Sequence, residues 1–154
     1  MHTSKNRNGS ALTEKAAKEC LSTIAYKPIL ANFCNIDGVD DFTSHDMEID
    51  DDGNIIYIEK QVGCFTADKP TMDKEADSEG RKYIYAKVAI PRDYTKAAEI
   101  IERKGGTKIS AELGINEMSY SASDKVLYLD SVVVMGATLL GKNPQNGDDI
   151  EEGM

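Results

Sequence analysis

The feature that most constrains the fold is an alternation of apolar and polar residues near the C-terminal end. From Thr107 to Tyr120 the chain reads TKISAELGINEMSY, and apolar residues recur at every second position. A period of two predicts a strand with one apolar and one polar face. The parity changes at Asn116-Glu117, which predicts a β-bulge. The turn-forming SASDK and the apolar run VLYLDSVVVMGATLLG follow, and they predict a long final strand pair or one bent strand.

Shorter strands and one or two helices are predicted upstream. DYTKAAEIIERKGG is typical of a helix that is capped at Asp93 or Thr95 and ended by two glycines. Thr13 is predicted to cap a shorter helix, and residues 26–33, interrupted by a proline, to form an edge strand. The sequence therefore predicts an α+β, mainly β fold: a small antiparallel barrel-like sheet of about six strands with one or two flanking helices.

The length of the chain limits the number of domains, and its net charge limits the classes of partner. The chain has 154 residues and a formal net charge of −9, which suits one domain that buries about 68–70% of its unfolded surface. We expect a disordered leader over residues 1–11, one folded domain over 12–144 and an acidic flexible tail over 145–154. The acidic balance argues against a nucleic-acid partner. No apolar run approaches the roughly 18 residues of a membrane span.

The stretch from Glu48 to Glu59, EIDDDGNIIYIE, has the spacing of oxygen ligands in a calcium-binding EF-hand loop. That motif needs a helix on each side of the loop. GVDDFTSH before it is rich in turn residues, and IIYIEKQVG after it favours a strand. The preferred interpretation is a β-hairpin that turns at residues 51–54, with a calcium-binding module as the alternative.

Three residues are candidates for chemistry. His45 is the one histidine outside the leader, Ser110 lies on the polar face of its predicted strand, and Asp130 interrupts an apolar run. A solvated histidine, a solvent-facing serine and an edge carboxylate are the simpler interpretations. A thiol–imidazole pair of Cys34 or Cys64 with His45 is a further possibility. The three cysteines form no CxxC, which favours a reducing intracellular setting, and no cluster of metal ligands is evident.

Four short motifs follow one another in a characteristic order along the chain. They are DFTSHD (41–46), IEKQVG (58–63), TKISAEL (107–113) and VVMGATLLGKNP (133–144). In this order, with a helix before the serine strand, they resemble the prohead proteases of tailed phages. That family is similar in fold to the herpesvirus maturational protease, assemblin. The resemblance covers roughly residues 20–144 and implies an assemblin-like fold.

By this resemblance the chain is a serine endopeptidase of capsid maturation, with His45 as the base and Ser110 as the nucleophile. Assemblin uses a second histidine as the third catalytic residue. The other histidine of this chain, His2, lies at the wrong end of the sequence for that role. Phage members use an acidic residue, and Asp130 fits the expected order of histidine, serine and acid. Glu112 and Glu117 are rivals for that role.

The resemblance also implies a biological setting. The partners would be the phage scaffolding protein and the major capsid protein, cleaved inside the assembling procapsid in the host cytoplasm. No cofactor or metal ion is needed, and a homodimer is expected by analogy with assemblin. Backbone N–H groups near Gly136 or Gly141 are candidates to bind the oxyanion. The competing class is an inactive structural or scaffolding phage domain with the same fold.

Overall fold

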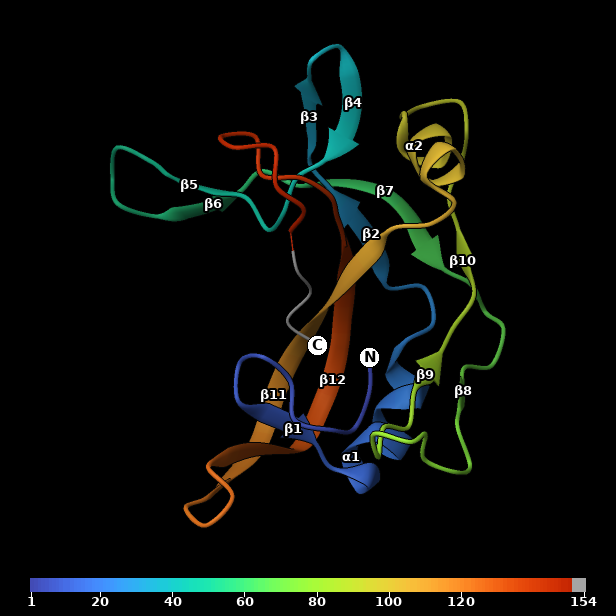
Figure 1. The fold of residues 1–154 in the computed structure, drawn as a ribbon, viewed down its shortest axis with the longest axis vertical. Helices are drawn as coiled ribbons and strands as arrows, with labels where there is room; N and C mark the ends of the chain where they lie inside the picture. Colours follow the sequence, from blue (N-terminus) through green and yellow to red (C-terminus); the bar gives the residue numbers. More distant parts are fainter. Residues whose placement is uncertain (151–154) are drawn as a thin grey trace.

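A computed structural model describes residues 1–150 of the chain (Figure 1). These residues form a mainly β structure, with 44% of residues in strands and 12% in helices, and the main sheet curls into a half-barrel. The predicted α+β, mainly β fold class is therefore confirmed.

The main sheet is built around a long antiparallel hairpin of β11 (Lys108–Ser121) and β12 (Val126–Leu140). The opposite edge of β12 pairs in parallel with β1 (Ser10–Leu12) and β2 (Pro28–Ala31). The sheet continues through β7 (Lys60–Phe65) to β10 (Val88–Ala89). Within residues 1–150, no strand pairs with the outer edge of β11.

Three two-stranded hairpins complete the β structure. They are β3 (Phe33–Ile36) with β4 (Val39–Phe42), β5 (Met47–Ile49) with β6 (Ile55–Tyr57), and β8 (Thr71–Met72) with β9 (Ile84–Tyr85). The first two project outward from one end of the sheet (Figure 1). The β5–β6 turn is closed by a hydrogen bond from Asp50 N to Asn54 O (3.0 Å). The predicted hairpin within residues 48–59 is thus confirmed.

Two short α-helices and one 3-10 turn flank the sheet: α1 (Glu14–Cys20), η1 (Leu21–Thr23) and α2 (Ala97–Lys104). Thr13 caps α1 as predicted, because its hydroxyl accepts a hydrogen bond from Ala16 N (3.3 Å). Gly105 ends α2 at a positive φ of 68°. Neither α-helix within residues 1–150 is long and apolar enough to cross a membrane.

The N-terminal segment, expected to be a disordered leader, belongs to the folded unit. Residues Ser10–Leu12 form β1, and Met1 O accepts a hydrogen bond from Ile84 N (2.9 Å). The first part of the predicted acidic tail contacts the folded domain, because Ile150 N donates a hydrogen bond to Gly141 O (2.8 Å). Residues 151–154 of the predicted tail lie outside the described residues.

Two predictions about individual strands have different outcomes. The predicted bulge in β11 is confirmed by register shifts on both sides of Glu117. The prediction of an edge strand at residues 26–33 is wrong, because β2 lies between β12 and β7. Pro28 is tolerated there because it is the first residue of the strand.

The hydrophobic core brings buried residues of the sheet together with buried residues of α1 and α2. Leu12, Ala16, Cys20, Ile29 and Leu139 are all almost completely buried in it. Burial of such side chains contributes about 25 cal/mol for each Å² of apolar surface removed from water. The core therefore holds β12 in place, because α1, β1 and β2 all contact this strand.

The end of β12 is joined to the segment after β4 by close backbone contact at Gly141. Gly141 N donates to Thr43 O (2.9 Å), and Lys142 N donates to Phe42 O (2.8 Å). A Cβ atom at Gly141 would overlap the carbonyl oxygen of Phe42. This contact orders the residues that lead into His45.

We therefore predict that Gly141→Ala lowers the free energy of unfolding by about 1–3 kcal/mol, the usual range for forced overpacking. Urea denaturation would measure the change. Gly114→Ala is the matched control, because a Cβ atom there meets a rotatable side-chain methyl of Val133 as its nearest atom, not backbone. Equal losses in the two variants would contradict the role given to the Gly141 contact.

Candidate functional site

The loop between β4 and β5 holds His45 in a fixed position. The carboxylate of Asp46 accepts hydrogen bonds from the Thr43 hydroxyl and from Asn32 Nδ2 (2.7 Å). Thr43 N donates to Asn32 O (3.0 Å), and Ile58 N donates to Asp46 O (3.3 Å). The loop is thus tied to both neighbouring segments, which restricts the positions open to the imidazole.

The strands β11 and β12 supply the second part of the site. Ser110 and Glu112 are two residues apart on β11, so their side chains share one face of the strand. Ser110 is paired in register with Thr138 of β12. Thr138 is fully buried, and its hydroxyl donates a hydrogen bond to the Glu112 carboxylate. This bond fixes Glu112 beside Ser110.

Glu59, immediately before β7, supplies a second carboxylate. Its side chain is only 4% exposed. The Oε1 atom is buried and makes no hydrogen bond within residues 1–150. An ionised carboxylate in such a place is costly unless a positive charge or a proton is near.

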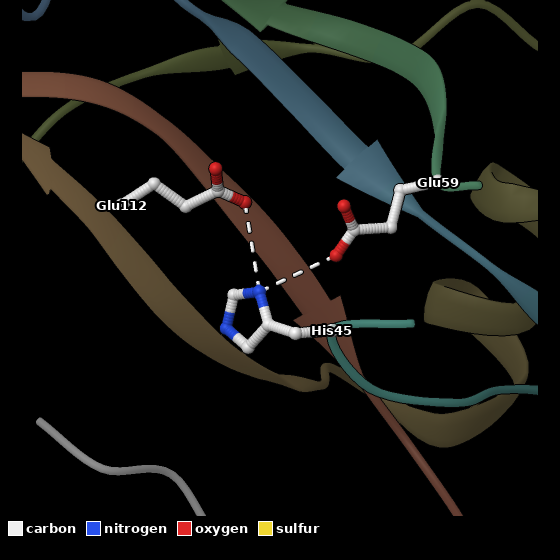
Figure 2. Close-up of side chains that lie close together, drawn as sticks. All are labelled: His45, Glu59 and Glu112. Carbon is white, nitrogen blue, oxygen red and sulfur yellow. Dashed lines mark ion pairs between the residues drawn. The ribbon is translucent and has the colours of Figure 1, made fainter. Parts of the chain in front are cut away.

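The imidazole of His45 lies where these two carboxylates converge (Figure 2). Its Nδ1 atom is 3.3 Å from Glu59 Oε1 and 3.7 Å from Glu112 Oε1. Its other nitrogen, Nε2, points away from both carboxylates (Figure 2). The His45 side chain is 39% exposed, so the cluster is open to small molecules on the imidazole side.

The electrostatics of the cluster follow from this convergence. Burial raises the pKa of Glu59, and the charge of Glu112 raises it further. The neighbouring His45 acts in the opposite direction. The two carboxylates can therefore orient an imidazole and stabilise its positive form, or they can act with Nδ1 as ligands of a cation.

Of the three residues singled out in the sequence, His45 contacts Glu112, and Ser110 lies two residues from Glu112 on β11. Asp130 is not part of this group. It lies eight residues before Thr138 on β12, which corresponds to about 26 Å at ~3.3 Å per residue along a strand. The carboxylates beside His45 are Glu59 and Glu112, and Glu112 was the rival named in the sequence.

Two further expectations are affected by the structure. Burial, together with the charges of Asp41 and Asp46, raises the pKa of the Cys34 thiol, which keeps it protonated and unreactive. Gly141 is not an oxyanion donor in this conformation, because its N–H is already bonded to Thr43 O.

Glu59 was not singled out from the sequence as a residue of the candidate site. The β5–β6 hairpin pairs Met47 with Tyr57. Extending that register by two residues on each strand places His45 opposite Glu59. The turn predicted at residues 51–54 would have placed His45 opposite Lys60 instead, and the glutamate was considered only as the last position of a calcium loop.

The site thus belongs to a mainly β domain with a histidine held by two carboxylates at the end of a curled sheet. The family described as YonD N-terminal domain matches residues 1–151, and the chain belongs to that family. The chain matched none of the curated proteins and none of the solved structures with which it was compared.

The buried carboxylate of Glu59, whose Oε1 makes no hydrogen bond within residues 1–150, leads to a prediction about stability. With a chelator present, Glu59→Gln should raise the free energy of unfolding at neutral pH by on the order of 1 kcal/mol, a usual size for a single substitution. The reason is that it removes a desolvated charge repelled by Glu112. Thermal denaturation would measure this, with Glu48→Gln, in the exposed strand β5, as control. A less stable Glu59→Gln variant would show that the charge is favourable in the fold.

Proposed function

We propose that the chain is a serine endopeptidase of the prohead-protease type, with Ser110 as nucleophile and His45 as general base. The proposal rests chiefly on one observation: His45 Nδ1 faces two carboxylates while Nε2 points away from them (Figure 2). A serine peptidase needs this orientation, because the acid holds Nδ1–H and leaves the Nε2 lone pair for the serine proton.

The position of Ser110 supports the proposal. Ser110 is half-buried and shares the β11 face with Glu112, which lies two residues away, or about 6.6 Å along the strand. It is also the cross-strand neighbour of Thr138, whose hydroxyl holds Glu112. Ser110 is thus a strand neighbour of the residue whose carboxylate contacts the imidazole, which supports its proposed role.

The reaction then follows the usual order of acyl transfer. Ser110 Oγ attacks the peptide carbonyl while His45 Nε2 takes the hydroxyl proton, and the imidazolium is stabilised by Glu59 and Glu112. His45 returns the proton to the leaving amine, which departs. Water, activated by the same imidazole, hydrolyses the acyl-enzyme and restores the serine.

The open edge of β11 supports a peptide as the substrate class. Within residues 1–150 no strand pairs with that edge. An extended peptide can add to such an edge through backbone hydrogen bonds. A peptide bound there would run past Ser110. The scaffolding and major capsid proteins, implied by the sequence resemblance, are the proposed substrates in the assembling procapsid.

One observation favours the non-enzymatic alternative, an inactive structural or scaffolding domain. Within residues 1–150, the charged contacts of the His45 imidazole are with Glu59 and Glu112, and no hydrogen bond from Ser110 to it is seen. Such bonds are often long before substrate binds. Labelling of the serine therefore distinguishes the two functions better than its distance from the imidazole.

We predict that an active-serine phosphonate probe labels Ser110 in the unmodified chain. Labelling should be abolished in Ser110→Ala and strongly slowed in His45→Ala, because the hydroxyl then lacks its base. Mass spectrometry of the labelled peptide would locate the modification. Ser121→Ala, near the far end of β11, is the matched control and should label normally. If the probe does not react with Ser110, the domain is not a serine peptidase through this residue.

A second prediction concerns the acid. Replacing the aspartate of a Ser-His-Asp triad by asparagine costs about 10⁴ in turnover. With two carboxylates at Nδ1, we expect a smaller loss for Glu112→Gln, about 10- to 1,000-fold in labelling rate, and a greater one when Glu59→Gln is added. Asp130→Asn should stay within about two-fold, since Asp130 lies far along β12. The reverse ranking of Glu112→Gln and Asp130→Asn would restore Asp130 as the acid.

A further inference from the structure

The cluster of His45, Glu59 and Glu112 has a second property that peptidase chemistry does not require. One potential ligand atom from each residue lies within 4.8 Å of the other two. One of the three, Glu59 Oε1, belongs to a side chain that is 96% buried, and within residues 1–150 it makes no hydrogen bond. A buried carboxylate oxygen that makes no hydrogen bond is expected to bind some other partner. Glu59 Oε1 points toward His45 Nδ1, so that partner would lie between the two atoms (Figure 2).

The spacing fits a small divalent cation. Zinc binds imidazole nitrogen and carboxylate oxygen at about 2.0–2.2 Å, which in a tetrahedral site puts ligand atoms roughly 3.4 Å apart. The separations from Nδ1 to the two carboxylate oxygens are 3.3 and 3.7 Å. Two of the three ligands come from fixed backbone: Glu59 next to β7, and Glu112 held by Thr138. Modest side-chain adjustment would therefore complete the site.

We propose that His45, Glu59 and Glu112 bind one divalent transition-metal ion, of which Zn²⁺ is the best match, and that the bound ion switches off the peptidase. One nitrogen and two oxygen ligands suit Zn²⁺ better than Mg²⁺ or Ca²⁺, which prefer oxygen ligands alone. A fourth position remains for water. The inhibitory part of this inference rests on the proposed function, whereas the binding part does not.

Inhibition follows from the tautomers of a single imidazole. In the peptidase, Nδ1 carries the proton and Nε2 has the free lone pair that accepts the Ser110 proton. A cation on Nδ1 needs the lone pair there, so the proton of the neutral ring must sit on Nε2. Nε2 then cannot accept a proton. The cation also occupies the two carboxylates that would stabilise the imidazolium.

Metal binding is tested separately from catalysis by using the Ser110→Ala protein, which lacks the nucleophile and keeps all three ligands. Calorimetric titration with Zn²⁺ should show one ion per chain. Glu59→Gln and Glu112→Gln should each weaken binding by at least about 10- to 100-fold, the range seen when mere supporting residues are lost. His2→Gln, a histidine elsewhere in the fold, should bind normally. Binding no tighter than millimolar, or binding unchanged in both glutamine variants, would overturn the site.

The identity of the ligands has its own readout. The electronic spectrum of the Co²⁺-loaded protein should lack thiolate charge-transfer bands, because the proposed site has no sulfur ligand. Thiolate bands that remain in Glu59→Gln would place the ion on cysteine instead and would contradict the assignment.

Inhibition is tested with the phosphonate probe on the unmodified chain. Zn²⁺ above its dissociation constant should slow labelling of Ser110 at least ten-fold, and EDTA should restore the rate. In Glu59→Gln, the ratio of rates without and with Zn²⁺ should fall toward one. Faster labelling in the presence of Zn²⁺ would contradict inhibition. Metal-dependent hydrolysis that persists in Ser110→Ala would also contradict it and would indicate a metal-activated reaction. Absence of any labelling would refute the proposed peptidase while leaving the calorimetric test of the site intact.

Discussion

The backbone ladder between β11 and β12 is the interaction on which the rest of the structure depends. Its thirteen cross-strand pairs join β11 to β12 along almost the whole length of both strands. On its other edge β12 pairs with β1 and β2, and it also contacts α1, so much of the core forms against it. Because the ladder fixes the register of Ser110 with Thr138, it also fixes Glu112 relative to the His45 loop. The packing of the core and the geometry of the candidate site therefore depend on the same strand pairing.

The cluster at His45 contains an electrostatically unfavourable contact, because the buried Glu59 carboxylate lies near the Glu112 carboxylate. Two carboxylates converge on one imidazole nitrogen, and burial raises the pKa of Glu59. Perturbed groups of this kind occur often at functional sites, because the strain is retained only where it is used. A proton on Nδ1 and a metal ion on Nδ1 both relieve the repulsion. The proposed peptidase and the proposed metal inhibition are thus two ways of neutralising the same charge.

The fold was largely predictable where local signals were strong. Alternation predicted β11, the change of parity predicted its bulge, and Thr13 predicted the start of α1, because each depends on residues close in sequence. The position of β2 was not predictable, since the sheet order depends on long-range pairing. The N-terminal segment was misjudged for a similar reason: its polar composition suggested disorder, but β1 is ordered by hydrogen bonds to β12, more than 100 residues away.

For the candidate site, the sequence by itself determined which residue types were available: one histidine outside the N-terminal segment, a serine on the polar face of a strand, and many carboxylates. It also determined the β5–β6 hairpin, because turn residues are a local signal, but not the exact register that brings His45 opposite Glu59. Only the tertiary structure decided which carboxylates meet the imidazole. Glu112 reaches it and Asp130 does not, because the choice depends on where the β4–β5 loop contacts the long hairpin. That contact joins segments almost 100 residues apart, and no local pattern encodes it.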